Sequence, residues 1–472
     1  YSEKSDKDYD PLKDPSIDQS LLGHTYQVVM PMTVTKVKDG HTVENTATQV
    51  TNDRRDKTNT VTNPLKEINP TKDVTVKVGG DSIDGKSVYL NHTFLYRLDS
   101  SILPPDRAYQ TVTDWGGTDQ LTTEYDQYLG NWAVYASRDL YRDGQVLAAR
   151  GEKIAGSGFD SSKFGGNLFA VDADGNGKVT VNATQAYLDL VSADNEHEAG
   201  WVLYLQCKRI AVADEVPNTW TETINGQPRE SNKVVTKTPD MTPSIHLEKV
   251  DTPTLKQEGQ ERADRDDPKQ ALKMDADSIG ITFIITNTSK TDPATGDGAW
   301  FKASDLDLAD STIVGDAHVD MDSLAYPDNW DTLVLKPGES VSVTGTLKGV
   351  REGDTHTDRA IVTGTPLVEC APSNGDPFND KTDGGEDTDP EYSTGDVTEI
   401  DGKRLCADTQ VTSNTDDWNG YRAKSLASTG TAVLGLAGGA LAVLLAGGSL
   451  LVFRKRHRAQ GSGRHTSVNA GK

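Results

Sequence analysis

Three oxygen-bearing side chains at alternate positions are the first group in the sequence that could do chemistry. Asp172, Asp174 and Asn176 precede Gly177 in the sequence DADGNG, and this spacing matches the first ligands of a calcium loop. The twelfth position, where such a loop needs a bidentate glutamate, is Ala183, and the flanking residues alternate as strands do. We therefore expect a plain turn between two strands and keep calcium binding by Asp172, Asp174 and Asn176 as the alternative.

The cysteines form the second group. Cys370 and Cys406 flank a stretch rich in Gly, Asp and Pro, where few apolar residues could hold a loop in place. In an exported chain we expect these two cysteines to form a disulfide. Cys207 lies in the strand-like sequence VLYLQC, and we expect it to be a small buried hydrophobic residue.

Known hydrolase signatures are missing from the sequence. It contains no GxSxG, no HExxH and no phosphate-binding loop. His197 lies between Glu196 and Glu198, which is typical of an acidic surface turn. We therefore expect that the chain is not an enzyme and that it needs no cofactor, apart from the calcium alternative.

The C-terminal tail contains an uncharged apolar run, Thr431–Phe453, followed by the basic residues Arg454, Lys455, Arg456 and Arg458. A run of this length can cross a bilayer as a helix, and the basic cluster should remain in the cytoplasm. We therefore expect a C-terminal transmembrane segment in the precursor and an extracellular location for the residues before it.

The pentapeptide before this run is Leu426, Ala427, Ser428, Thr429 and Gly430. Its order with the apolar run and the basic tail resembles the sorting signal of Gram-positive surface proteins, in the LAxTG form of actinobacteria. The resemblance implies that a sortase cleaves the Thr429–Gly430 bond and passes the threonine carbonyl to a peptidoglycan or pilin amine. The membrane helix is then a temporary handle, and the mature protein is located in the cell wall.

Composition agrees with an exported protein. The 472 residues include 72 acidic and 48 basic side chains, which gives a formal net charge of −24. Nucleic acid is therefore an improbable partner by electrostatics, because phosphate binding requires clustered Lys and Arg. The chain begins with Tyr1 and without a secretory signal, so we expect that its natural N-terminus lies upstream.

Short alternating segments separated by Gly, Asp and Pro predict an all-β fold of tandem immunoglobulin-like or adhesin β-sandwich domains plus a C-terminal transmembrane helix. Proline-containing joints divide the chain into four predicted parts. These are the remnant of a sandwich at 1–70, a sandwich at 71–242, an immunoglobulin-like stalk domain at 243–424 and the sorting signal at 425–472.

Residues from about 21 to 242 resemble the C-terminal domains of antigen I/II surface adhesins. The segments that carry this resemblance are NPTKDV at 69–74, GKSVYLNHTFLYRLD at 85–99, and ESNKVVTKTP around Asn232. The resemblance implies sandwiches that each contain a Lys-to-Asn isopeptide bond. It also implies binding to a host or bacterial ligand that the sequence does not identify.

In the domain at 71–242, Lys72 lies in the first predicted strand and Asn232 in the last. The resemblance therefore implies an isopeptide bond between these two residues. A buried lysine loses its proton more readily, and a buried carboxylic acid can shuttle protons as ammonia leaves. We expect Asp99 to be this acid, with Asp114 as the alternative.

The third block resembles immunoglobulin-like repeats of bacterial stalks through ITFIITNTS, LKPGESVSVTGTL and HTDRAIVTGT. Together these features predict a wall-anchored adhesin stalk that presents an upstream binding region. The alternatives are the stalk of a wall enzyme whose catalytic head lies upstream, and a minor or tip pilin. The motif with which a pilus shaft subunit supplies its linking lysine is not found.

Overall fold

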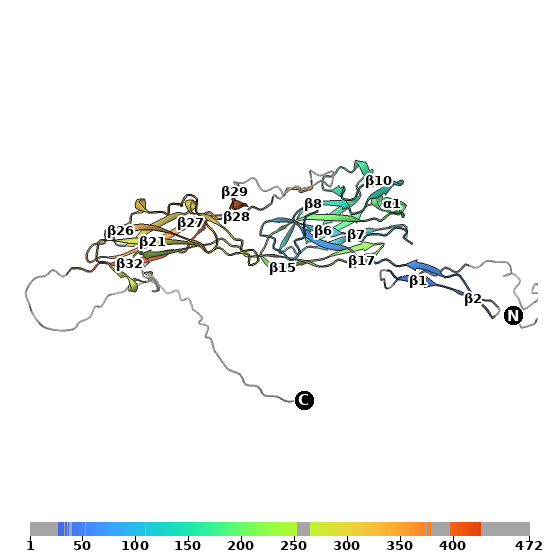
Figure 1. Ribbon diagram of the computed structural model, residues 1–472, viewed down its shortest axis with the longest axis horizontal. Coiled ribbons are helices and arrows are strands. Elements are labelled where there is room, and N and C mark those ends of the chain that lie inside the picture. The colour runs from blue at the N-terminus through green and yellow to red at the C-terminus, as the bar shows by residue number, and fades with distance from the viewer. Residues whose placement is uncertain are drawn as a thin grey trace, which may run out of the picture. The chain divides into compact units, whose positions relative to one another are not determined.

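The computed structural model describes residues 27–32, 34, 36, 40–51, 53–108, 110–252, 265–372, 375–378 and 397–425. These residues form strands almost throughout, with one α-helix and a few single 3-10 turns among them (Figure 1). The predicted all-β fold class is therefore confirmed. The predicted membrane span lies outside the described residues, and no helix within them is long and apolar enough to cross a bilayer.

The first described strands form two small antiparallel ribbons. Strand β1 (Thr42–Asn45) pairs with β4 (Val61–Pro64), and β2 (Thr48–Thr51) pairs with β3 (Arg54–Lys57). All of their described residues are exposed, because Thr, Asn and charged residues occupy both faces. These ribbons therefore have no core of their own.

The first β-sandwich consists of two five-stranded sheets. One sheet has the order β11-β8-β14-β6-β5, and the other has the order β12-β13-β7-β16-β17. The bounds are β5 (Thr71–Thr75), β6 (Thr93–Asp99), β7 (Trp115–Gln120), β8 (Asp126–Ala136), β11 (Lys153–Gly156), β12 (Phe169–Ala173), β13 (Lys178–Ala183), β14 (Trp201–Arg209), β16 (Trp220–Ile224) and β17 (Gln227–Glu230).

Aromatic side chains fill the space between these two sheets. Trp115, Trp201 and Trp220 are each no more than 1% exposed, and their rings contact one another through Trp201. Strand β7 fits here because Gly116 and Gly117 have no side chain. A Cβ on Gly117 would lie 2.7 Å from the Trp220 ring, and one on Gly116 would lie 2.3 Å from the Val181 carbonyl oxygen.

Smaller elements complete the first sandwich. Helix α1 (Gln185–Ala193) buries one apolar side against the core, and β15 (Ala213–Asn218) pairs with β18 (Val234–Thr238). A short hairpin joins β9 (Leu140–Arg142) to β10 (Gln145–Ala148).

The second β-sandwich has a four-stranded sheet, β19-β21-β26-β24, and a sheet with the order β20-β32-β27-β23 in which β31 also pairs with β27. The bounds are β19 (Ile245–Asp251), β20 (Leu272–Lys273), β21 (Ser278–Asn287), β23 (Asp307–Val314), β24 (His318–Val319), β26 (Ser340–Lys348), β27 (Thr355–Gly364), β31 (Val411–Thr412) and β32 (Asp416–Tyr421). Its core is mainly aliphatic, and Phe283 and Trp418 supply large buried rings.

A small three-stranded sheet, in the order β28-β30-β29, follows β27 along the chain. It consists of β28 (Leu367–Glu369), β29 (Val397–Ile400) and β30 (Lys403–Ala407). A two-stranded pair, β22 (Phe301–Lys302) with β25 (Val334–Leu335), completes the described strands of this block.

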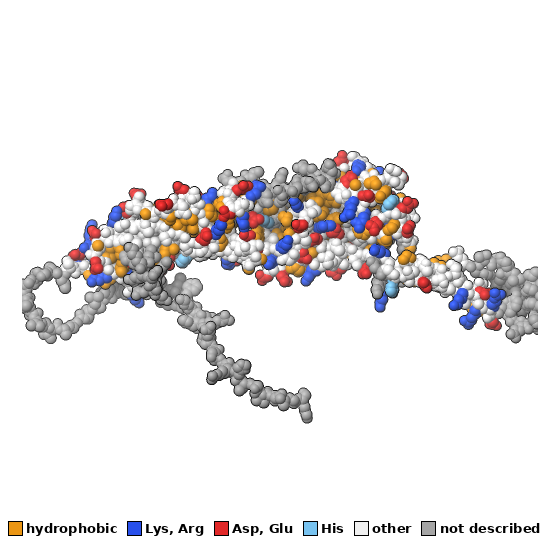
Figure 2. Space-filling model, in the orientation of Figure 1, with side chains coloured by type: hydrophobic (Ala, Val, Ile, Leu, Met, Phe, Trp, Pro, Cys, Tyr) orange, Lys and Arg blue, Asp and Glu red, His pale blue; other side chains and the backbone are white. Residues whose placement is uncertain are grey.

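Acidic and basic side chains are interspersed over the visible surface of the two sandwiches, without a large patch of one sign (Figure 2). On this face the acidic residues are therefore spread out. Such a surface favours solubility and offers no basic footprint for nucleic acid on this face.

Candidate functional site: buried lysine–carboxylate clusters

Each sandwich buries one lysine of its first strand. In β5, the side chain of Lys72 is fully buried and forms an ion pair with the equally buried Asp119 of β7. The ammonium also lies 4.5 Å from the centroid of the Tyr96 ring. Burial lowers the pKa of Lys72, and the negative charge of Asp119 opposes this shift.

Asn232 contacts Lys72 in a different way from the predicted one. The backbone N–H of Lys72 donates to Asn232 Oδ1 at 2.8 Å, and Asn232 Nδ2 donates to the Lys72 carbonyl oxygen at 2.9 Å. The amide therefore extends the hydrogen-bonding edge of β5, while the lysine ammonium points into the core. The structure thus places the two residues side by side, and the isopeptide bond between Lys72 and Asn232 stays a prediction.

The two acids that we expected to promote that bond are also placed elsewhere. Asp99 accepts a hydrogen bond from Arg97 Nη2 at 2.7 Å, and burial raises the pKa of its carboxyl. Asp114 Oδ1 accepts from the backbone N–H of Gly226 at 3.1 Å. The carboxylate that contacts the Lys72 ammonium is that of Asp119, which was missed from the sequence.

A second buried ion pair lies near Lys72. Arg209 Nε donates to Asp126 Oδ1 at 2.8 Å, and both side chains are at most 1% exposed. The Tyr96 hydroxyl donates to the other carboxylate oxygen of Asp126 at 2.7 Å. The remaining guanidinium nitrogens of Arg209 donate to the hydroxyls of Thr236 and Thr238. Each carboxylate oxygen of Asp126 therefore accepts a hydrogen bond.

The lysine of the second sandwich has two carboxylates instead of one. In β19, the fully buried Lys249 forms ion pairs with Asp310 of β23 and with Asp358 of β27, whose Oδ1 lies 2.6 Å from the ammonium nitrogen. His356 Nε2 lies 3.2 Å from Asp358 Oδ2. Burial and the charge of Asp358 raise the pKa of Asp310 to about 6, although Lys249 opposes the shift.

An asparagine also lines the first strand of the second sandwich. Asn414 Oδ1 accepts from the backbone N–H of Leu247 at 2.9 Å, and Asn414 Nδ2 donates to the Leu247 carbonyl oxygen at 2.9 Å. Two residues further along β19, the backbone N–H of Lys249 donates to Asp416 Oδ2 at 3.0 Å. Both sandwiches thus hold the edge of their first strand with a side-chain amide.

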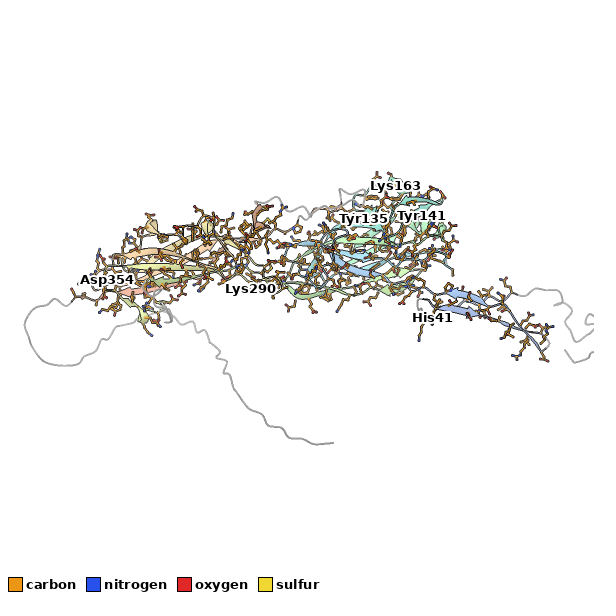
Figure 3. All side chains as sticks on the ribbon, viewed as in Figure 1. His41, Tyr135, Tyr141, Lys163, Lys290 and Asp354 are labelled. Atoms are coloured by element: carbon orange, nitrogen blue, oxygen red, sulfur yellow. A yellow bond between two sulfur atoms is a disulfide. The ribbon has the colours of Figure 1, made fainter. Side chains whose placement is uncertain are left out.

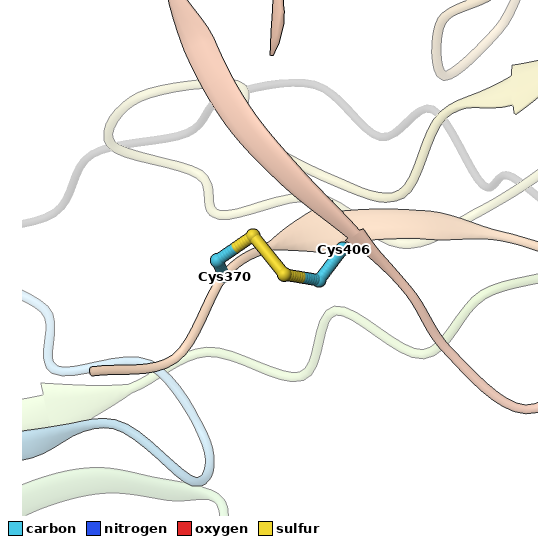
Figure 4. Close-up of a disulfide and its surroundings, with 2 residues drawn as sticks. All are labelled: Cys370 and Cys406. Carbon is cyan, nitrogen blue, oxygen red and sulfur yellow. A yellow bond between two sulfur atoms is a disulfide. The ribbon is translucent and has the colours of Figure 1, made fainter. Parts of the chain in front are cut away.

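Cys370 and Cys406 form a disulfide with a Cα–Cα distance of 4.9 Å (Figure 4). Cys370 follows β28 and Cys406 lies in β30, so the bond reinforces a pair of strands with few apolar side chains. Cys207 is free and buried in β14, beside Lys72 in the core of the first sandwich.

The predicted calcium loop is a turn between β12 and β13. Asp174 Oδ1 accepts hydrogen bonds from the backbone N–H groups of Asn176 and Lys178, so the carboxylate closes the turn. Within the described part of the chain, no group of three His, Cys, Asp or Glu side chains could hold a metal ion. The loop has the expected form of a turn between two strands, and calcium binding by Asp172, Asp174 and Asn176 stays a prediction.

His197 belongs to a surface pocket of the first sandwich. Its ring stacks on Tyr141, labelled in Figure 3, with the centroids 3.7 Å apart, and Nδ1 lies 3.0 Å from Asp194 Oδ2. Helix α1 and the β9–β10 hairpin form the walls of this open hollow. The residues predicted for sorting, Leu426–Gly430, lie outside the described residues.

Comparison with known proteins finds two family models that match the first half of the chain. The family model for the cell surface antigen C-terminus matches residues 69–239, and the model for the cell surface antigen I/II C2 terminal domain matches residues 1–65. Aggregation substance of Enterococcus faecalis is 35% identical over 233 residues, which cover 48% of this chain and 17% of that protein. The chain thus corresponds to a small part of this relative's length.

Solved structures include two antigen I/II proteins. The C-terminal domain of Streptococcus pyogenes AspA is 28% identical, with a TM-score of 0.36, and the alignment covers 42% of this chain and 54% of that one. The C-terminal domain of Streptococcus agalactiae BspA is 23% identical, with a TM-score of 0.36, over 42% of this chain and 58% of that one. By its two family matches, this chain carries C-terminal domains of the cell surface antigen I/II family.

Proposed function

We propose that this chain is the wall-proximal stalk of a surface adhesin that a sortase attaches to the cell wall. The observation that carries the proposal is the order of the domains and the C-terminal sequence segments along the chain. Antigen I/II C-terminal domains precede Leu426–Gly430, an uncharged apolar run and a basic tail. The domains account for a surface location, and the tail supplies the chemistry of attachment.

The sorting step transfers an acyl group. A sortase cysteine attacks the carbonyl carbon of Thr429, the bond to the nitrogen of Gly430 breaks, and a wall peptide amine then displaces the cysteine. Before this step, the run Thr431–Phe453 holds the chain in the membrane, and afterwards it is discarded. The partners are thus a sortase, an amine of the wall and a ligand bound upstream of this chain.

The stalk domains suit this position because their described residues offer cross-links and dense cores in place of a catalytic centre. The two sandwiches bury their first-strand lysines against carboxylates, and a disulfide closes the loop between β28 and β30. We infer that the stalk holds a binding region away from the wall.

The test is mass spectrometry of protein released from the wall of the producing cells by a muramidase. We expect the C-terminal peptide to end at Thr429 with a wall fragment attached. Thr429→Ala should leave the chain in the membrane fraction with its tail intact, whereas Ser428→Ala, at the variable position of the motif, is the matched control and should be anchored normally. Wall-linked protein that retains residues beyond Gly430 would contradict the proposal.

A further inference from the structure

One sheet of the first sandwich is apolar on both of its faces. In β14, Trp201 and Leu203 belong to the core between the sheets, whereas Tyr204 points to the opposite side. The buried apolar side chains on this outer face are Leu95, Ala133, Tyr135, Val202 and Tyr204. A sheet of an antiparallel sandwich is ordinarily apolar toward the core and polar toward water. Strands β6, β8 and β14 therefore carry a second apolar face, which needs a cover.

Phe378 covers this outer face from a distant part of the chain. Its side chain is 0% exposed and packs in the same cluster as Tyr135, which is labelled in Figure 3, and Tyr204. These two tyrosine rings meet edge to face, with their centroids 5.7 Å apart. The segment 375–378, which contains Phe378, begins shortly after Cys370, in the block of the second sandwich. A side chain of the second block is thus buried on the first sandwich.

Two polar side chains of the first sandwich bind the backbone of this segment. Lys153 Nζ donates to the Phe378 carbonyl oxygen at 2.8 Å, and Gln206 Nε2 donates to the Gly375 carbonyl oxygen at 3.1 Å. Lys153 and Gln206 are themselves only 5% and 2% exposed. Buried donors of this kind are costly without an acceptor. The segment therefore supplies partners that the outer face requires at two separate points.

The segment is also shaped for this contact by a turn of its own. Asp376 Oδ1 accepts a hydrogen bond from the backbone N–H of Phe378 at 2.8 Å, and Pro377 between them has a restricted φ. The other carboxylate oxygen, Asp376 Oδ2, accepts from Ser157 Oγ at 3.1 Å. A peptide that is already held in its bound form loses less conformational entropy when it binds.

We propose that the outer face of the β11-β8-β14-β6-β5 sheet is a binding site for the segment 375–378 of the same chain, and that this contact restricts rotation between the two sandwiches. The chain itself passes from one sandwich to the other between β18 and β19. Domains joined at one point move relative to each other by default. The segment adds a second point of attachment, and the Cys370–Cys406 disulfide fixes the place where it leaves β28 to the neighbouring β30.

Another contact between the two blocks is too small to replace the segment. The Tyr89 hydroxyl of the first block donates to Asp297 Oδ2 of the second at 3.0 Å, and Asp297 also forms an ion pair with Lys403 of β30. A single hydrogen bond contributes little net free energy. We therefore expect the restriction to depend on Phe378. This inference does not depend on sortase anchoring.

The first test measures how well Lys153 is covered in the full chain, by acetylation with an amine-reactive ester and peptide mapping. Burial lowers the pKa of Lys153, although the charge of Asp376 opposes this shift, so the amine would react readily if the reagent reached it. We expect wild-type Lys153 to remain unlabelled while the half-exposed Lys163 is labelled. Dilution should not change this result, because the segment belongs to the same molecule.

Two outcomes of this first test would overturn the proposal. Labelling of Lys153 in the wild-type chain would show that the outer face is not covered. Protection that is lost on dilution would show that the bound segment comes from a second copy of the chain.

Two substitutions of Phe378 separate binding from folding. Phe378→Asp places a charge against the apolar face, so Lys153 should lose its protection. Phe378→Leu retains an apolar side chain and is the matched control, in which Lys153 should stay covered. Both variants should form the Cys370–Cys406 disulfide and keep the near-ultraviolet circular dichroism of the buried tryptophans, because Phe378 lies outside the cores of both sandwiches. Protection that persists in Phe378→Asp would overturn the role of this side chain.

The second test measures rotation between the sandwiches by double electron–electron resonance. Spin labels are placed at Lys163→Cys in the first sandwich and Lys348→Cys in the second, since both lysine side chains are about half exposed, and the free Cys207 is buried. We expect a narrow distance distribution when Phe378 is present and a broad one in Phe378→Asp. Equally narrow distributions in both chains would overturn the proposed restriction.

Discussion

The two sandwiches differ in the number of carboxylates that contact their buried first-strand lysine. Each buries a lysine in its first strand, and each holds the edge of that strand with an asparagine side chain. In the first sandwich, Lys72 meets one carboxylate, and the charges cancel. In the second, Lys249 meets two, and His356 lies beside one of them, Asp358. The number of buried carboxylates around the lysine is therefore the main difference between the two sites.

The largest effect that tests this comparison is the loss of Lys72. We expect Lys72→Met to destabilise the first sandwich by about 3–5 kcal/mol, because Asp119 is then a buried and unpaired charge. The double variant with Asp119→Asn should recover much of the loss. Hydrogen exchange of the β5 and β6 amides measures both. An equal loss in the single and the double variant would show that packing, and not charge, dominates this site.

The disulfide lies in the part of the chain that contains the second sandwich. Its removal should give the next largest loss of stability. Cys370 and Cys406 are 36 residues apart in the sequence. In the chain-entropy model a closed loop of this size stabilises by about 3–4 kcal/mol. We expect the double variant Cys370→Ser and Cys406→Ser to lower the protection of β28 and β30 from hydrogen exchange. The first sandwich is the internal reference and should keep its protection, because its only cysteine is free.

The asparagines give a smaller effect that should be similar in both sandwiches. Asn232→Ala and Asn414→Ala each remove two hydrogen bonds to a backbone edge, at net values of about 0.5–1.5 kcal/mol per bond. Denaturant unfolding, with each sandwich followed by its own hydrogen-exchange signal, measures the two losses. A loss confined to one sandwich would break the parallel between them.

The smallest effect concerns pH and is argued for Asp416 of the second sandwich. Burial, and a hydrogen bond that the protonated Asp416 carboxyl donates to Asp266, raise the pKa of Asp416 to about 8. Because the folded value lies above the ordinary value of 3.8, this group's contribution is complete below pH 3.8 and is lost as the pH rises through 8.

We therefore expect the melting temperature of the second sandwich to fall as the pH rises from about 4 to 8 and to level off above pH 8, a window set by the ordinary value of 3.8 and the raised pKa of Asp416 at about 8. Asp416→Asn should flatten this response, and an unchanged slope in the variant would assign the response to another group. Differential scanning calorimetry at several pH values provides the measurement.

Much of this architecture could be predicted from alternation, but the contacts of the buried charges could not. The segments HTFLYRL, KVTVNA and GWVLYLQC became β6, β13 and β14 because their apolar residues recur with period two. Strand β7 was missed because Gly116 and Gly117 interrupt the alternation, although Gly117 leaves room for the Trp220 ring and Gly116 for the Val181 carbonyl oxygen. Asp119 was missed with that strand.

Lys249 carried a signal that could have been used. In β19 the inward positions are Ile245, Leu247 and Lys249, so a lysine occupies the apolar register of the strand. Which acids meet it depends on how two sheets face each other, and sequence spacing does not encode this. Asn232 was correctly placed beside Lys72 in the fold, but its amide contacts the backbone rather than the ammonium.

The asparagine side chains that border the first strands also make each sandwich sensitive to chemical ageing. Deamidation replaces Nδ2 by an oxygen, so the side chain loses its donor and retains only acceptors. At Asn232 that oxygen would face the Lys72 carbonyl oxygen, and at Asn414 it would face that of Leu247. Two oxygens would then repel each other where a hydrogen bond had been. A protein that stays on the cell surface for long periods would therefore loosen first at these two strand edges.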